Sequence, residues 1–186
     1  IFTTSEEVGM EGASALDPSV LKGHTMVNLD SEGEGVLLAG CAGGCHMQVN
    51  LPLERESVTG IFATLKVDGL KGGHSGTEIN KGRANANQLL GQVLTALAEK
   101  VPYHLVTLAG GMKDNAITRE AEAQLIFASK TEAEEAERIV AVRGNVLRET
   151  YKETDAGVTV TLTVGEEEKV AAMTAESAAK VRALLI

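Results

Sequence analysis

The chain has 186 residues, enough for one ordinary domain or two small ones and too few for a large multidomain enzyme. Its 17 Lys and Arg against 26 Asp and Glu give a net charge of −9, which excludes a basic surface for nucleic acid or an anionic membrane. Because 44% of the residues are hydrophobic and only 3% are aromatic, we expect a globular protein without a stacking platform for bases.

The sequence also bears on location and completeness. It has no basic, apolar leader, and apolar runs such as residues 36–39 are far too short to span a membrane. Two cysteines are too few for a disulfide scaffold, so we expect reduced thiols and a cytoplasmic location. The chain begins without Met and ends inside an apolar helical pattern, which predicts an internal fragment of a longer protein.

The first fifty residues are interrupted by glycine. A helical turn is predicted at residues 12–16, and three β-rich runs are predicted as strands of an α/β core, at residues 25–29, 35–39 and 47–51. Pro52 and the charged residues 54–56 then predict a domain boundary, because proline cannot donate to a sheet and charged side chains favour solvent.

The remaining residues show a regular alternation of strand and helix periods. The predicted strands are residues 57–70, 103–108, 116–129 and 157–164, and the predicted helices are residues 83–100, 131–151 and 174–185. Up to residue 164 this order is βαββαβ, so we expect a split βαβ or ferredoxin-like α+β sandwich. In the second helix, Thr131 and Glu134 form a predicted capping box. The predicted buried stripe of that helix is Ile139, Val142, Val146 and Leu147.

Three carboxylates near the N-terminus are candidate metal ligands. Glu6 and Glu7 are adjacent, so in extended chain one could ligate a metal while the other reaches a bound water. Asp30 follows an apolar run, at the position where ligands collect in α/β sheets. The alternatives are a solvated acidic pair at a helix start and an Asx turn at Asp30. Together the three oxygen donors indicate a metal without specifying it, and a Mg or Ca site stays open.

Cys41, Cys45 and His46 could also be interpreted as part of a zinc cluster. No second pair of ligands follows at the usual spacing, so buried reduced thiols are the preferred interpretation.

The segment at residues 70–76 is the most unusual in the chain. Three glycines surround His74, which allows close approach of the backbone to a ligand and presents the imidazole as a donor or proton carrier. A surface histidine is the alternative, and a phosphate loop is disfavoured because no Gly-Lys-Ser/Thr ending follows. His24 and His104 have no partners at ligand spacing and are expected to be structural or exposed.

Five motifs, in order along the chain, together resemble aminoacyl-histidine dipeptidases, a cytosolic branch of the dizinc metallopeptidases that include carboxypeptidase G, peptidase T and carnosinase. The motifs are TSEEVGMEGA at residues 4–13, NLDSE at 28–32, GCAGG at 40–44, LKGGHSG at 70–76 and GRANAN at 82–87. The resemblance implies a partial catalytic domain at residues 1–54 and a lid and dimerisation domain at residues 55–186, with a homodimer formed through the lid.

The resemblance also implies roles for single residues. Glu6 matches the general base, Glu7 a ligand of one zinc and Asp30 a ligand of the other. His74 matches a lid histidine that polarises the scissile carbonyl of the partner subunit's substrate, and Asn115 a lid residue that contacts substrate. Asn115 lies in the segment GGMKDNAITRE at residues 110–120, in which Thr118 stands where the family usually has proline.

The family's upstream His-x-Asp, bridging Asp and late His ligand have no counterpart in the sequence. We therefore expect a fragment of a zinc-dependent dipeptidase for Xaa-His substrates that is inactive by itself. The alternative is a stand-alone, non-catalytic dimerisation or binding module.

Overall fold

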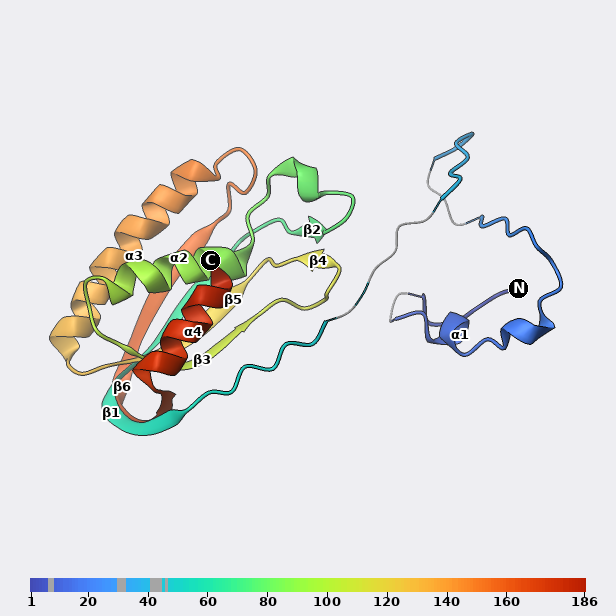
Figure 1. Cartoon of the computed structure of the whole chain (residues 1–186). Coiled ribbons are helices and arrows are strands. Elements are labelled where there is room, and N and C mark those ends of the chain that lie inside the picture. Colours follow the sequence, from blue (N-terminus) through green and yellow to red (C-terminus); the bar gives the residue numbers. More distant parts are fainter. Residues whose placement is uncertain (7–8, 30–32, 41–44, 46) are drawn as a thin grey trace. The chain divides into compact units, whose positions relative to one another are not determined.

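The computed structural model describes residues 1–6, 9–29, 33–40, 45 and 47–186 (Figure 1). The chain divides into two compact units, Ile1–Gln48 and Val49–Ile186. None of the helices in the described part of the chain combines the length and the apolar character needed to span a bilayer.

The described residues of the N-terminal unit include two short helical turns. α1 spans Glu11–Ser14, close to the predicted turn, and the 3-10 helix η2 spans Pro18–Val20, where the Asp17 side chain accepts a hydrogen bond from the backbone of Ser19. The three predicted strands were wrong: the described residues of this unit form no strand. A strand is defined by pairing into a sheet, and the described backbone of these runs is not paired in this way. Their apolar side chains are exposed, for example Leu37 at 97%.

The expected burial of the thiols was also wrong for the cysteine that can be checked. Cys45 is a free thiol but is exposed, and it belongs to no helix or strand. Cys41 and His46 lie outside the described residues.

The C-terminal unit is built on a four-stranded antiparallel sheet with the order β3-β5-β1-β6. Its strands are β1 (Arg55–Asp68), β3 (His104–Gly110), β5 (Ala121–Phe127) and β6 (Thr159–Met173). The helices are α2 (Ala86–Ala98), α3 (Lys130–Thr150) and α4 (Ala175–Leu185). This order confirms the predicted βαββαβ arrangement, with α4 following the last strand.

The three helices cover one face of the sheet (Figure 1). On β1, alternate residues Ala63, Leu65 and Val67 are fully buried against them. The leucines of α2 recur every three or four residues, so they lie on one face, and Leu89 and Leu97 are also completely buried. A core made of small and aliphatic side chains therefore forms between the helices and the sheet.

A second, smaller apolar cluster lies at the far end of the sheet. There β1 and β6 extend beyond the end of β5. The pairing of β1 with β5 ends at Ile61 and Phe127, whereas the pairing of β1 with β6 continues to Arg55 and Met173. The guanidinium of Arg55 donates to the carbonyl oxygens of Val106 on β3 and Ala171 on β6, at 2.9 and 3.0 Å. The cluster consists of Val106, Ile126 and Ala172, with Val58, Phe62 and Val170 packed against it.

Several element boundaries differ from prediction for local reasons. α2 begins at Ala86 and not at residue 83, because the Asn85 side chain caps it. The predicted strand 116–129 is divided into β4 (Ala116–Ile117) and β5. The last strand continues beyond its predicted end at residue 164 as far as Met173, because β1 pairs with it throughout.

The start and the buried face of α3 also differ from prediction. Its N-cap is Ser129, whose hydroxyl accepts from the backbone of Glu132, so Thr131 is not the cap. Val142 and Val146 are 64% and 50% exposed. Leu147 of the predicted stripe is buried and Ile139 packs partly buried against the core, and the other buried residues of the helix are Ala133, Ala136, Val140 and Gly144. The helix therefore turns its smaller residues inward, where Gly144 lies against Val160 of β6.

Candidate functional site on the His74 loop

The connection between β1 and α2 carries the predicted lid histidine. Residues 71–84, named the His74 loop, contain the short strand β2 (Gly73–His74) and the 3-10 helix η3 (Ile79–Lys81). β2 pairs antiparallel with β4, with His74 opposite Ala116. The backbone N–H of Ser75 donates to the carbonyl oxygen of Asn115 at 2.9 Å. The structure therefore brings together two predicted site residues, His74 and Asn115, and both are exposed.

The imidazole of His74 is oriented by its own loop. Its Nδ1 accepts hydrogen bonds from the backbone N–H groups of Gly76 and Thr77, at 3.1 and 3.3 Å. A nitrogen that accepts two N–H groups carries no proton of its own, so in the neutral ring the proton is on Nε2. His74 is thus held as the tautomer that presents an outward N–H donor.

A charged cluster holds the backbone around His74. Glu78 accepts from the backbone N–H of His74 at 3.1 Å and pairs with Lys81 and Arg83 at 2.7 and 3.0 Å. The hydrogen bond from Lys81, the backbone hydrogen bond from His74 and the charge of Arg83 lower the pKa of Glu78 to about 2. Gly73 has a φ of 138°, and a Cβ there would overlap with both Glu78 and Arg83. Glycine is therefore required for this cluster to close over the strand.

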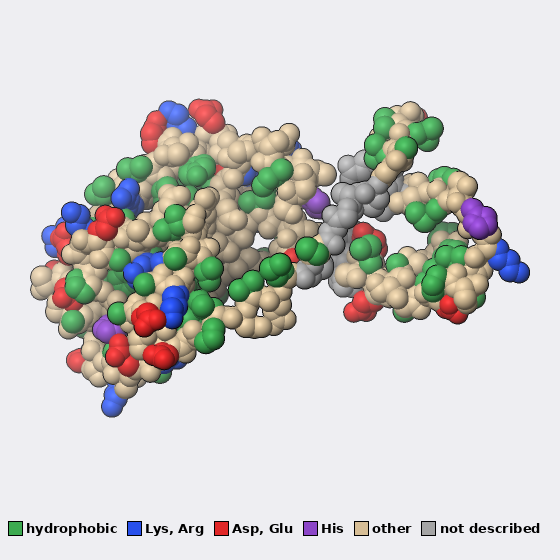
Figure 2. Space-filling model, viewed as in Figure 1, with side chains coloured by type: hydrophobic (Ala, Val, Ile, Leu, Met, Phe, Trp, Pro, Cys, Tyr) green, Lys and Arg blue, Asp and Glu red, His purple; other side chains and the backbone are tan. Residues whose placement is uncertain are grey.

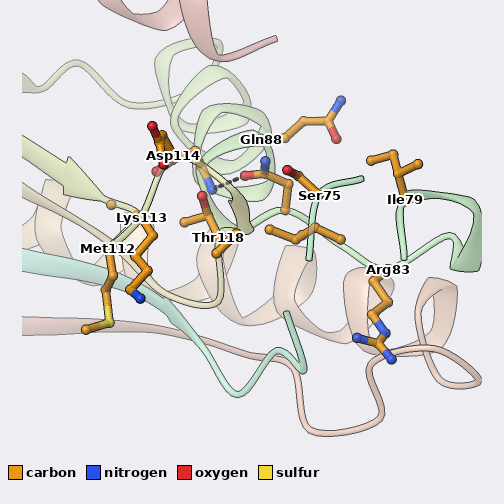
Figure 3. A pocket seen from close by; sticks show the side chains of 14 residues that line it. Ser75, Ile79, Arg83, Gln88, Met112, Lys113, Asp114 and Thr118 are labelled. Carbon is orange, nitrogen blue, oxygen red and sulfur yellow. Dashed lines mark hydrogen bonds between the residues drawn. The ribbon is translucent and has the colours of Figure 1, made fainter. Parts of the chain in front are cut away.

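A pocket of about 780 Å³ lies beside the His74 loop (Figure 3). It is formed by the loop, the first turn of α2 and the segment from the end of β3 to β4. Figure 3 shows Lys113 and Met112 on one side of it and Arg83 and Ile79 on the other. Lys113 and Arg83 are its two cationic residues and Asp114 is its one acidic residue.

The amide side chains at the start of α2 also line this pocket. The Asn85 side chain accepts from the backbone of Asn87 at 3.0 Å, and the Oδ1 atom of Asn87 is buried and accepts no hydrogen bond from the described residues. The carbonyl oxygen of Thr118 accepts from the backbone N–H of Ala86 at 3.0 Å, which joins β4 to the helix start. The motif at residues 82–87 contains Asn85 and Asn87, so the sequence drew attention to both. The motif alone does not predict that they line the same pocket as Lys113.

The other predicted site residues lie in the N-terminal unit. Glu6 is exposed, and its carbonyl oxygen accepts from the backbone of Gly9 and Met10. Glu7 and Asp30, the predicted metal ligands, lie outside the described residues. Across residues 1–6, 9–29, 33–40, 45 and 47–186, no group of three or more His, Cys, Asp or Glu side chains is arranged to hold a metal. The described side chains therefore do not by themselves form a zinc centre.

The surface charge is mixed in sign. On the face shown in Figure 2, Lys and Arg side chains are interspersed with Asp and Glu. His104 lies 3.7 Å from the carboxylate of Glu56, outside the pocket.

Parts of the chain are similar to known peptidases. Residues 65–155 match the family described as a peptidase dimerisation domain. Over 131 residues the chain is 45% identical to the cytosol non-specific dipeptidase of Escherichia coli (strain K12). This matched region covers 69% of this chain and 27% of that enzyme. The crystal structure of aminoacylhistidine dipeptidase from Vibrio alginolyticus matches with a TM-score of 0.70 and 30% identity, over 98% of this chain and 37% of that one.

The chain thus spans well under half the length of both relatives. The family match includes His74, Asn115 and the whole of the pocket. Residues 65–155 therefore match a peptidase dimerisation domain, and the chain is similar to these dipeptidases over the stated spans, which confirms the resemblance predicted from its motifs.

Proposed function

We propose that this chain is part of a zinc-dependent dipeptidase that hydrolyses Xaa-His dipeptides. The observation that carries the proposal is the geometry of His74: an exposed imidazole, held with its proton on Nε2, on a domain related to dipeptidases. Such a donor can hydrogen-bond to the carbonyl oxygen of a peptide and stabilise the negative charge that develops there in the transition state.

The remaining chemistry is assigned to residues 1–54, which are proposed as the catalytic part. Glu6 is proposed as the general base that takes a proton from the attacking water and passes it to the leaving amine. Glu7 and Asp30 are proposed as ligands of two zinc ions. Zinc, when bound, lowers the pKa of a coordinated water and polarises the carbonyl. Residues 55–186 would act as the lid and dimerisation domain, so that His74 serves the partner's substrate.

The pocket beside the His74 loop is proposed to hold the substrate. A dipeptide carries a carboxylate, which the guanidinium of Arg83 or the ammonium of Lys113 can pair with. Amide groups can bind the peptide bond, with Asn115 adjacent to His74 and Asn87 inside the pocket. By the name of its E. coli relative, the parent protein would act in the cytosol.

We further propose that the isolated chain is inactive, because the resemblance supplies only Glu7 and Asp30 as zinc ligands. The second candidate function is a non-catalytic dimerisation module. It is favoured by the C-terminal unit, which has its own core and is compact by itself.

A chimera tests the proposal. The aligned segment of this chain replaces its counterpart in the E. coli dipeptidase, and hydrolysis of Xaa-His dipeptides is measured with added zinc. We expect activity in the chimera, a loss of about a hundredfold or more in kcat with His74→Ala, and little change with His104→Ala. A folded, dimeric chimera without activity would favour the non-catalytic module. Hydrolysis by the isolated chain at the rate of the chimera would contradict its proposed inactivity.

A further inference from the structure

Asp155 is a fully buried acidic side chain that the proposed reaction does not use. It lies in the turn between α3 and β6, and its side chain is 0% exposed. A carboxylate in such surroundings is unfavourable unless hydrogen-bond donors surround it. Its partners therefore indicate what the structure uses it for.

The two oxygens of this carboxylate bind the two ends of the His74 loop. Oδ1 accepts from the backbone N–H of Lys71, where the loop begins, and Oδ2 accepts from the backbone N–H of Ala84, where it ends; both distances are 2.9 Å. Because one rigid carboxylate makes both bonds, the two ends of the loop are held at a fixed separation. From its position in the turn sequence TDAG, Asp155 would be interpreted as an ordinary surface turn residue.

The main chain around Asp155 is itself anchored. Its N–H donates to the carbonyl oxygen of Tyr151 at the end of α3, at 2.7 Å, and its carbonyl oxygen accepts from Val158, just before β6, at 3.0 Å. The carboxylate is therefore attached to the helix and to the strand of the core, and not to a mobile loop. The position of the His74 loop is therefore set by the core, through this carboxylate.

Two glycines allow the two segments to approach closely. Gly69 precedes the loop with a φ of 80°, and a Cβ at this position would overlap with the carbonyl oxygen of Gly157, two residues after Asp155. A side chain at residue 69 would separate the segments and remove Asp155 from the reach of Lys71. The turn between α3 and β6 and the start of the His74 loop are neighbours in Figure 1 as well.

We infer that Asp155 is a positioning residue, which holds the His74 loop in the conformation that orients the His74 imidazole. The functional meaning of this inference rests on the proposed donor role of His74. The positioning itself concerns the folded chain and is tested without catalysis. Failure of the chimera would refute the proposed function alone, and failure of the following experiment would refute the positioning alone.

The experiment uses nuclear magnetic resonance on the isotope-labelled 186-residue chain. At mildly alkaline pH, the ¹⁵N shifts of the His74 ring report which nitrogen carries the proton, and amide exchange reports the bonds of Lys71 and Ala84. In the unchanged chain we expect the Nε2–H tautomer and protected amides at both loop ends. Asp155→Asn keeps the shape but loses one acceptor, and we expect at least one of these amides to exchange about tenfold faster or more.

We also expect Asp155→Asn to produce a mixture of His74 tautomers and faster exchange at Gly76 and Thr77. The control is Val140→Ala, a core change in α3 at a residue 2% exposed, which weakens the fold without touching the loop. Unchanged tautomer and amides in Asp155→Asn would overturn the inference, and so would an equal response in Val140→Ala. If Asp155→Asn does not fold, amide exchange in the unchanged chain tests the inference. Unprotected amides at Lys71 and Ala84 would then overturn it, and protection of both would support it.

Discussion

The backbone N–H of Ser75 donates a hydrogen bond of 2.9 Å to the carbonyl oxygen of Asn115. This bond lies at the end of the β2–β4 ribbon, beside the pair formed by His74 and Ala116. It joins the residue after His74, the predicted carbonyl-polarising residue, to Asn115, the predicted substrate-contacting residue, although the two segments are far apart in the chain. The lid residues of the proposed site are therefore arranged by a two-strand ribbon and not by the main sheet.

Glu78→Gln should loosen the His74 loop. The glutamine side chain keeps an acceptor for the N–H of His74 but loses its charge, and with it the pairs to Lys81 and Arg83. We expect the His74 amide to exchange severalfold faster, because hydrogen bonds to a charged acceptor are the stronger ones. Amide hydrogen exchange measures the change. Glu120→Gln is the control, because Glu120 is an exposed carboxylate that pairs only with Lys66 in the described structure, at 3.6 Å. Equal protection of the His74 amide in both variants would contradict the prediction.

The stability difference between the unchanged chain and Glu78→Gln should depend on pH. The pKa of Glu78 is lowered from 4.5 to about 2 by Lys81, the His74 N–H and Arg83. A carboxyl group with a lowered pKa in the folded state stabilises the fold fully above its unfolded pKa, and this contribution is lost as the pH falls through the folded pKa. The difference should therefore be present at neutral pH and shrink between pH 4.5 and pH 2. Urea unfolding of both proteins across this range measures it, and a difference that stays constant or grows on acidification would refute the assignment.

Two neighbouring residues of α3 should respond differently to truncation. Leu147 is 6% exposed and packs in the core, whereas Val146 is 50% exposed. Leu147→Ala should lower the free energy of unfolding by about 2–5 kcal/mol, and Val146→Ala should change it by no more than about 0.5 kcal/mol. The midpoints of urea unfolding compare the two. A large loss for Val146→Ala would restore the buried stripe that the sequence predicted.

The start of α3 offers a second matched pair. Ser129 accepts from the backbone N–H of Glu132, whose carboxylate accepts from the N–H of Ala128 at 2.9 Å. Removing the cap with Ser129→Ala should cost about 1 kcal/mol of unfolding free energy. Thr131→Ala removes a hydroxyl from inside the first turn and should change stability by no more than about 0.5 kcal/mol. The reverse order in thermal or urea unfolding would show that Thr131 is the cap.

Much of the C-terminal unit could be predicted because its elements bury one face at a regular period. The alternation of Ala63, Leu65 and Val67 and the three- and four-residue spacing of the α2 leucines are local properties of the chain. They determine which residues form strands and helices, and in what order. The family motifs likewise predicted roles for His74 and Asn115 from their immediate neighbours.

The tertiary structure alone decided which of two apolar stripes on α3 is buried. Val142 and Val146 are larger than Ala136 and Gly144, and so are the more apolar choice from sequence. The helix nevertheless turns the small residues inward, where a Cβ at Gly144 would already be in van der Waals contact with Val160 of β6. Packing distance is a property of two elements together, and neither sequence segment contains it.

The same distinction applies to the site. By itself the sequence determined the βαββαβ order, the glycines that surround His74 and the motif that contains Asn115. Only the tertiary structure paired His74 with the residues beside Asn115, and only it buried Asp155 between the two ends of the His74 loop. Local period and turn chemistry depend on neighbours in the chain. A hydrogen bond between residues 71 and 155 depends on how the whole core brings them together.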